Sequence, residues 1–152
     1  AASDDIGIST GGTYGTDAPY ITAGDLKAAG ATTRRARFLF TLPAEYVSAE
    51  SVRISAFAGM VTTAADTSCT IDFEAYKLDL DATVGGSNLV STAAISINST
   101  TIAERAFDLT ASGLAAGDVL DIRVTIACND AASATAVIPA IAALRLLLDI
   151  KG

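Results

Sequence analysis

Residues able to do acid–base or nucleophilic chemistry are scarce in this sequence. The chain of 152 residues has no histidine, which excludes Ser–His and Cys–His catalytic pairs and any imidazole-bound metal. None of Lys27, Lys77 and Lys151 follows a serine at Ser-x-x-Lys spacing. The pairs Gly11–Gly12 and Gly85–Gly86 lack the lysine and the helix of a phosphate-binding loop. We therefore expect no enzyme, no cofactor and no metal site.

Carboxylates are the remaining groups that could carry chemistry. Asp72 and Glu74 share one outward face of a predicted strand, and Asp79 and Asp81 follow at its end. Paired carboxylates can hydrolyse a glycoside or bind Ca²⁺, but the Asp79-x-Asp81 spacing lacks the further oxygen ligands of a calcium loop. We interpret these carboxylates as solvated surface groups. Tyr76, beside Asp72 and Glu74, is the best candidate for a sugar-binding ring, although we favour packing against a neighbouring strand as its role.

The two cysteines, Cys69 and Cys128, cannot form a zinc site without histidine partners. Each lies at the edge of a predicted strand, so a disulfide is conceivable. We favour two buried, reduced thiols, because nothing else marks a disulfide-framed protein. The triplet 98–100 matches the pattern of an N-glycosylation acceptor, which matters only in a eukaryotic secretory pathway, and nothing in the sequence supports one.

Charge is low and its balance is acidic. The formal net charge is −7 and only 18% of residues are charged, while 51% are hydrophobic. The only dense basic cluster is Arg34, Arg35 and Arg37, so we expect no nucleic-acid partner and no membrane surface. The most apolar stretch, 137–150, is shorter than the ~20 residues of a membrane-spanning helix. So little charge predicts exposed apolar surface and therefore oligomerisation or lattice assembly.

Alternating segments from residue 34 onward predict antiparallel β-strands. Apolar residues recur at every second position in six series, which are 38–42, 52–60, 71–75, 95–97, 107–109 and 120–126. This period of two is typical of half-buried strands. Spacing of about a dozen residues per strand predicts an all-β, jelly-roll-like antiparallel sandwich of about eight strands over residues 34–152. A change of parity between Ile71 and Leu78 suggests a β-bulge near Tyr76.

The two ends of the chain are harder to interpret. In the last segment Leu144, Leu146 and Leu148 alternate with other residues as in a strand, yet Ala and Leu favour helix and Pro139 could open one. We choose strand, because a sandwich needs a closing partner. Residues 1–33 are punctuated by glycines and predict an extended N-terminal arm, with one possible helical turn at 25–29.

Four stretches of the sequence carry a resemblance to a known class of proteins. They are residues 58–76, Ile97-Asn-Ser, residues 113–126 and the terminal Leu147-Leu-Asp-Ile-Lys-Gly. Together they resemble virion structural proteins of tailed bacteriophages, over roughly residues 34–152. Proteins of this kind are often capsid cement or decoration proteins with a jelly-roll fold, commonly trimeric.

The resemblance implies a homotrimer that binds the major capsid protein on the outer surface of a phage head assembled in the host cytoplasm. Two alternatives stay open: a head-fibre or tail-associated sandwich that contacts host-surface glycans, and a secreted bacterial sandwich, which predicts an oxidised Cys69–Cys128 pair. Apolar residues in the arm or on outward strand positions are the candidate interface: Ile6, Ile8, Tyr14, Tyr20, Leu39, Phe57 and Leu147.

Overall fold

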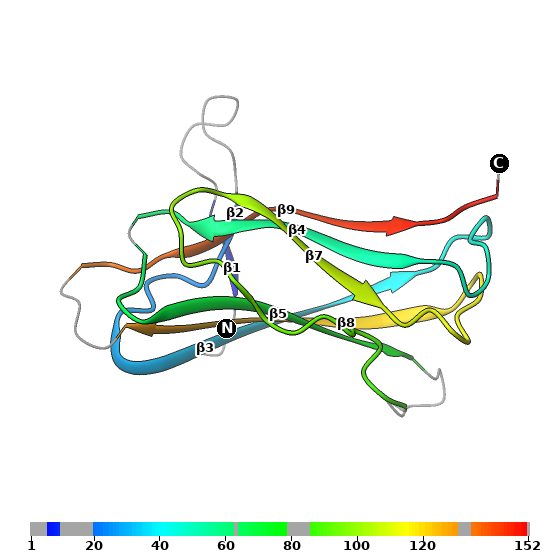
Figure 1. Ribbon diagram of the computed structural model, residues 1–152, viewed down its shortest axis with the longest axis horizontal. Coiled ribbons are helices and arrows are strands. Elements are labelled where there is room, and N and C mark those ends of the chain that lie inside the picture. The colour runs from blue at the N-terminus through cyan, green and yellow to red at the C-terminus, as the bar shows by residue number, and fades with distance from the viewer. Residues whose placement is uncertain (1–5, 10–19, 63, 79–85, 131–134, 152) are drawn as a thin grey trace.

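The fold is an antiparallel β-sandwich, as the alternation predicts. The computed structural model describes residues 6–9, 20–62, 64–78, 86–130 and 135–151. The strands in these ranges are β1 (Gly7–Ser9), β2 (Tyr20–Thr22), β3 (Ala28–Thr41), β4 (Val52–Met60), β5 (Ser68–Lys77), β6 (Ile95–Ser96), β7 (Ala103–Leu109), β8 (Val119–Asp130) and β9 (Pro139–Leu148). They form a five-stranded sheet, β1-β2-β9-β4-β7, and a four-stranded sheet, β3-β8-β5-β6 (Figure 1). Within these ranges no helix is long and apolar enough to cross a membrane.

The core fills the space between the two sheets. Each long strand turns alternate side chains toward this space. The apolar residues at every second position of β5 and β8 are therefore almost completely buried. The rings of Phe73 and Phe107, one from each sheet, meet edge-on with centroids 5.0 Å apart. This edge-to-face contact joins the two sheets across the core.

One short segment links the two sheets at an edge. The amide of Leu89 donates to the carbonyl of Ala75 in β5 (2.8 Å), and the carbonyl of Leu89 accepts from Thr110, just after β7 (2.7 Å). The amide of Ser91 donates to the carbonyl of Asp108 in β7 (2.9 Å). The sandwich is therefore closed on this side by main-chain hydrogen bonds.

The last segment is a strand, which confirms that choice over a helix. β9 lies between β2 and β4, with Leu144, Leu146 and Leu148 packed against the core. The prediction of a β-bulge near Tyr76 is wrong, because β5 pairs with β8 without a register shift as far as Lys77. The change of parity marks the end of the strand. A register shift occurs instead between β4 and β9, at Phe57 and Ala58.

Residues predicted to form an arm take part in both sheets. β1 pairs with β2, and β2 pairs with β9, at the edge of the five-stranded sheet. The predicted boundary at residue 33 falls inside β3, which pairs with β8 from Ala28 to Thr41. Ile6 lies against the four-stranded sheet, where its amide donates to the carbonyl of Arg35 (3.1 Å).

The predicted helical turn at 25–29 is wrong. A carboxylate oxygen of Asp25 accepts hydrogen bonds from the amides of Lys27 (3.0 Å) and Val137 (2.9 Å), and β3 begins at Ala28. These backbone donors lower the pKa of Asp25. A local Asp turn therefore competes successfully with the helix.

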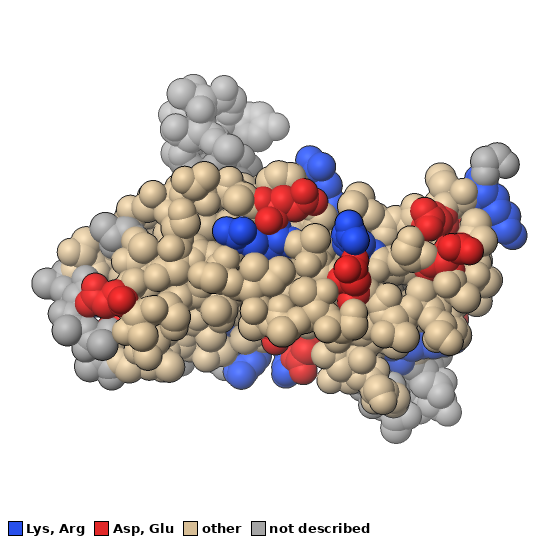
Figure 2. Space-filling model, in the orientation of Figure 1, with Lys and Arg blue, Asp and Glu red and all other residues tan. Residues whose placement is uncertain are grey.

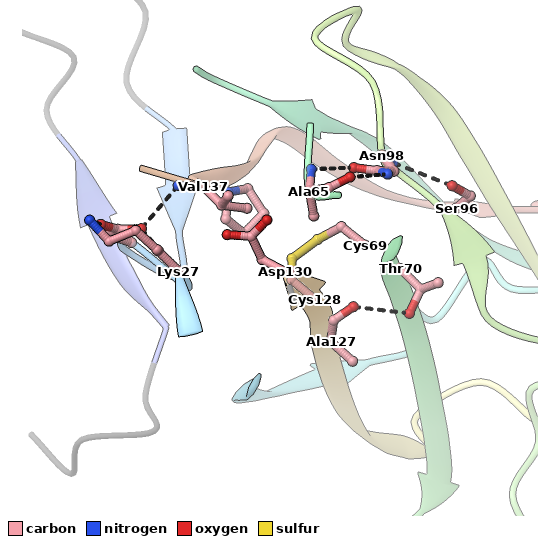
Figure 3. Close-up of a disulfide and its surroundings, with 12 residues drawn as sticks. Lys27, Ala65, Cys69, Thr70, Ser96, Asn98, Ala127, Cys128, Asp130 and Val137 are labelled. Carbon is pink, nitrogen blue, oxygen red and sulfur yellow. Dashed lines mark hydrogen bonds and ion pairs between the residues drawn. A yellow bond between two sulfur atoms is a disulfide. The ribbon is translucent and has the colours of Figure 1, made fainter. Parts of the chain in front are cut away.

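Cys69 and Cys128 are joined by a disulfide, so the prediction of reduced thiols is wrong (Figure 3). They are directly opposite in the β5–β8 ladder, with Cα atoms 4.0 Å apart, and both are buried. The sequence does not reveal this register, because the cysteines are 59 residues apart. The disulfide fixes the two central strands of the four-stranded sheet to each other.

The side chain of Asn98 has a structural role near this disulfide. Its Oδ1 accepts from the amide of Ala65 (2.7 Å) and its Nδ2 donates to the carbonyl of Ala65 (2.9 Å), as Figure 3 shows. This two-point contact holds the chain between β4 and β5. The amide nitrogen of the glycosylation-like triplet is thus engaged within the protein.

Candidate binding face

The outer face of the four-stranded sheet gathers polar side chains from three neighbouring strands. The register places them in three rows across β3, β8 and β5: Arg35–Thr125–Asp72, Arg37–Arg123–Glu74 and Leu39–Asp121–Tyr76. We call these nine residues the Tyr76 face. Because side chains alternate along a strand, all nine belong to the side that faces away from the core.

Two ion pairs are built into the Tyr76 face. Arg37 binds Asp121 through two bonds, Nε to Oδ1 (2.6 Å) and Nη2 to Oδ2 (2.7 Å). Arg123 donates from Nε to Oε2 of Glu74 (2.6 Å), and the hydroxyl of Tyr76 donates to Oε1 of the same carboxylate (3.4 Å). A two-bond Arg–carboxylate pair has fixed geometry. The pairs therefore hold charged groups in set positions beside the tyrosine ring.

Burial and hydrogen bonding shift two pKa values on this face. Asp121 is only 7% exposed although it lies on an outer face. Its hydrogen bonds raise the pKa of Arg37, which stays charged. Burial raises the pKa of Asp72, and the neighbouring Glu74 adds to the effect. The face thus combines a fixed ion pair with a carboxylate whose charged form is disfavoured.

A hollow of about 250 Å³ lies between the ion pairs, lined by Arg37, Tyr76, Asp121 and Arg123. It offers an aromatic ring, N–H donors and carboxylate acceptors within one small area. A guanidinium carries more donors than the two that Asp121 accepts, so Arg37 keeps donors for a ligand. In the described ranges no three acidic or cysteine side chains gather as a metal site would require. The chemistry on offer is recognition by hydrogen bonding and ring stacking.

Tyr76 is the best sugar-binding candidate in the sequence, although packing against a neighbouring strand is the role favoured there. The structure places it in this hollow beside Glu74. Arg37, Asp121 and Arg123 were missed. Their outward positions can be read from the alternation of β3 and β8. The sequence does not show that β3 and β8 lie beside β5, or in which register they pair.

The predicted interface residues do not form one surface. Ile6 packs against the core cluster and Ile8 is paired with Ile21 in β1. Tyr14 lies outside the described residues. Leu39 is 55% exposed on the Tyr76 face, whereas Leu147 is 45% exposed on the opposite sheet.

Phe57 belongs to the outer face of the five-stranded sheet, which we call the Phe57 face: residues 53, 55 and 57 of β4 with their outward neighbours on β7 and β9. The guanidinium of Arg145 lies over the Phe57 ring, 5.1 Å from its centroid. Arg53 donates to Asp108 (2.6 Å) and Ser55 to Glu104 (2.5 Å).

Tyr20 lines an apolar hollow of about 290 Å³ on the five-stranded sheet, together with Met60, Val61, Thr100, Ile102, Ala140 and Ala142. None of these residues is charged. In the view of Figure 2, charged side chains form small clusters separated by wide uncharged areas. The low proportion of charged residues thus leaves extended uncharged areas on the surface seen in this view.

Comparisons with known proteins support the fold. No family model and no curated protein matches the chain. Among solved structures, the chain is similar to TmCBM61 in complex with β-1,4-galactotriose, with a TM-score of 0.52 and 9% identity over 95% of this chain and 82% of the other. It is also similar to a family 16 carbohydrate-binding module, with a TM-score of 0.54 and 10% identity over 93% and 84%. The chain therefore shares the jelly-roll-like sandwich of these carbohydrate-binding modules.

Proposed function

We propose that this chain is a glycan-binding β-sandwich whose saccharide lies on the Tyr76 face. The observation that carries the proposal is the hollow in which a tyrosine ring adjoins two ion-paired arginines. A pyranose ring has an apolar C–H face and a rim of hydroxyls. An aromatic ring suits the first, and fixed donors and acceptors suit the second.

Two further findings support this proposal. The solved structures of similar fold are carbohydrate-binding modules, one of them in complex with β-1,4-galactotriose. The Cys69–Cys128 disulfide fits a chain exposed to an oxidising environment, where surface glycans are met. The role is binding without catalysis, as a head-fibre, tail-associated or secreted sandwich would require.

The test is calorimetric titration with four neutral trisaccharides: β-1,4-galactotriose, cellotriose, xylotriose and mannotriose. At least one should bind, and Tyr76→Ala should weaken its affinity about tenfold or more, because the stacking ring is lost. Phe57→Ala, an aromatic truncation on the opposite sheet, is the matched control and should leave affinity unchanged. Failure of all four sugars to bind, or equal loss in both variants, would contradict the proposal.

A second candidate function is that of a shell-binding structural protein: a homotrimeric cement protein that contacts a phage major capsid protein on the outside of the head. The observation in its favour is the set of exposed large apolar side chains: Leu39, Val61, Ile102, Leu147 and Ile150. Such residues on a charge-poor surface are typical of interfaces. The mass of the protein at micromolar concentration, with and without purified capsids, tests this candidate. A monomer that ignores capsids would contradict it.

A further inference from the structure

The Tyr76 face has a second apolar contact, and its position indicates what length of saccharide would fit. Leu39, Asp121 and Tyr76 are direct neighbours across β3, β8 and β5. Adjacent strands lie ~4.8 Å apart, so Leu39 and Tyr76 are separated by ~10 Å. Each pyranose residue extends an oligosaccharide by about one strand spacing, so this separation matches the first and third of three linked rings. The row therefore has an apolar group at each end and a fixed carboxylate between them.

Exposure supports a role for Leu39 in this row. Its side chain is 55% exposed, while the central Asp121 is 7% exposed and held by Arg37. An exposed leucine in a row of polar groups gains free energy when a ligand covers it. Tyr76 and Leu39 can thus each contact one terminal ring of a trisaccharide, and Arg37 and Asp121 can contact hydroxyls of the ring between them.

The charges of the face balance. Three basic residues, Arg35, Arg37 and Arg123, stand among three acidic ones, Asp72, Glu74 and Asp121. The formal charge of the face is therefore zero, although that of the whole chain is −7. Both ion-paired arginines are already neutralised by carboxylates. A uronate carboxylate placed on the row would lie beside Asp121 without an unpaired cation next to it, and the acidic chain would repel it from a distance.

We infer that the ligand is a neutral oligosaccharide of at least three residues, lying across the strands from Leu39 to Tyr76. This inference rests on the glycan-binding function proposed above. It specifies the length, direction and charge class of the saccharide.

The experiment uses the full chain and the neutral trisaccharide that binds tightest, with its disaccharide, its monosaccharide and tri-galacturonic acid. The trisaccharide should bind about tenfold more tightly than the disaccharide, because the third ring covers Leu39. Leu39→Ala should remove this gain and leave disaccharide binding unchanged. Leu147→Ala, an exposed leucine on the opposite sheet, is the matched control. Tri-galacturonic acid should bind at least about tenfold more weakly than the neutral trisaccharide.

The outcomes separate the inference from the function on which it rests. If Tyr76→Ala weakens binding but Leu39→Ala does not, or if tri-galacturonic acid binds best, the inference is overturned while the glycan-binding function stands. If no saccharide binds, both fall. Thermal melting of each variant shows whether it is folded, and these exposed leucines can be shortened with little effect on stability.

Discussion

The Tyr76 face and the Phe57 face present similar side chains in different arrangements. Each has an aromatic ring, an Arg–Asp pair and a further carboxylate on three neighbouring strands. On the Phe57 face the guanidinium of Arg145 covers the ring, and Arg53 and Asp108 have side chains that are 50% and 57% exposed. The Phe57 face also has a hollow, of about 240 Å³, beside the Arg53–Asp108 pair, but Phe57 does not line it. On the Tyr76 face the ring itself lines the hollow, and the side chain of Asp121 is 9% exposed.

The two faces differ in the burial of one ion-pair partner, and under the proposed function this burial separates the binding face from an ordinary solvated surface. An exposed ion pair loses side-chain entropy when it forms and is screened by salt, so its geometry is weakly fixed. A pair with a buried carboxylate and two hydrogen bonds is held in place by the surrounding strands. Only the second arrangement is preorganised for a ligand.

The largest expected effect comes from the disulfide, which lies in the four-stranded sheet. Replacing both cysteines, Cys69→Ala with Cys128→Ala, should lower the free energy of unfolding by about 4 kcal/mol, because a bridge over 59 residues restricts the unfolded chain. Urea denaturation of oxidised protein and of the double variant measures this. A loss below about 1 kcal/mol would contradict it.

A reducing agent under native conditions should have little effect on the same bridge, since both cysteines are buried. Thiol labelling before and after denaturation checks this. Rapid labelling of the folded protein would show that the four-stranded sheet opens readily around the disulfide.

The next effect compares the two Arg–Asp pairs directly. Asp121→Ala should destabilise the protein by about 1–3 kcal/mol, because it removes two charge-assisted bonds at a buried position. Asp108→Ala on the Phe57 face should cost at most about 1 kcal/mol, as exposed pairs do. Asp121→Ala should also weaken saccharide binding, whereas Asp108→Ala should not. Equal destabilisation by the two variants would remove the physical distinction between the faces.

The sequence predicts the strands of both faces but not how those strands pair with one another. Alternation identifies the outward residues Arg37, Asp121 and Glu74, and it identifies β9 as a strand. No local pattern pairs Cys69 with Cys128 or aligns Tyr76 with Asp121, because register depends on contacts between segments far apart in the chain. For the same reason, the disulfide and the hollow could not be predicted.

Local misinterpretations have local causes. The end of β5 at Lys77 has the sequence pattern of a bulge, because a strand end and a bulge both reverse the parity of the apolar residues. The turn at Asp25 resembled a helix start, because an Asp side chain that accepts backbone amides is common to both. Tyr76 could be singled out from sequence alone because it is an aromatic residue beside two carboxylates.

The smallest expected effect concerns the charge of Asp72. Burial raises the folded-state pKa of Asp72 above its unfolded value of 3.8, so ionisation costs more in the folded protein. Stability is therefore highest, as far as this group is concerned, below pH 3.8 and is lost as pH rises through the folded-state pKa. Asp72→Asn should raise the Tm at pH 7 by on the order of 2 °C.

The same substitution should have no stabilising effect below about pH 3.5, where Asp72 is protonated in both states. Melting curves of both proteins at pH 7 and pH 3 test this. Glu104→Gln on the Phe57 face is the control for removing an outward carboxylate. If Asp72→Asn lowers the Tm at pH 7, the carboxylate makes a contact worth more than its burial costs. The Tyr76 face would then depend on that third acidic group as well as on its two ion pairs.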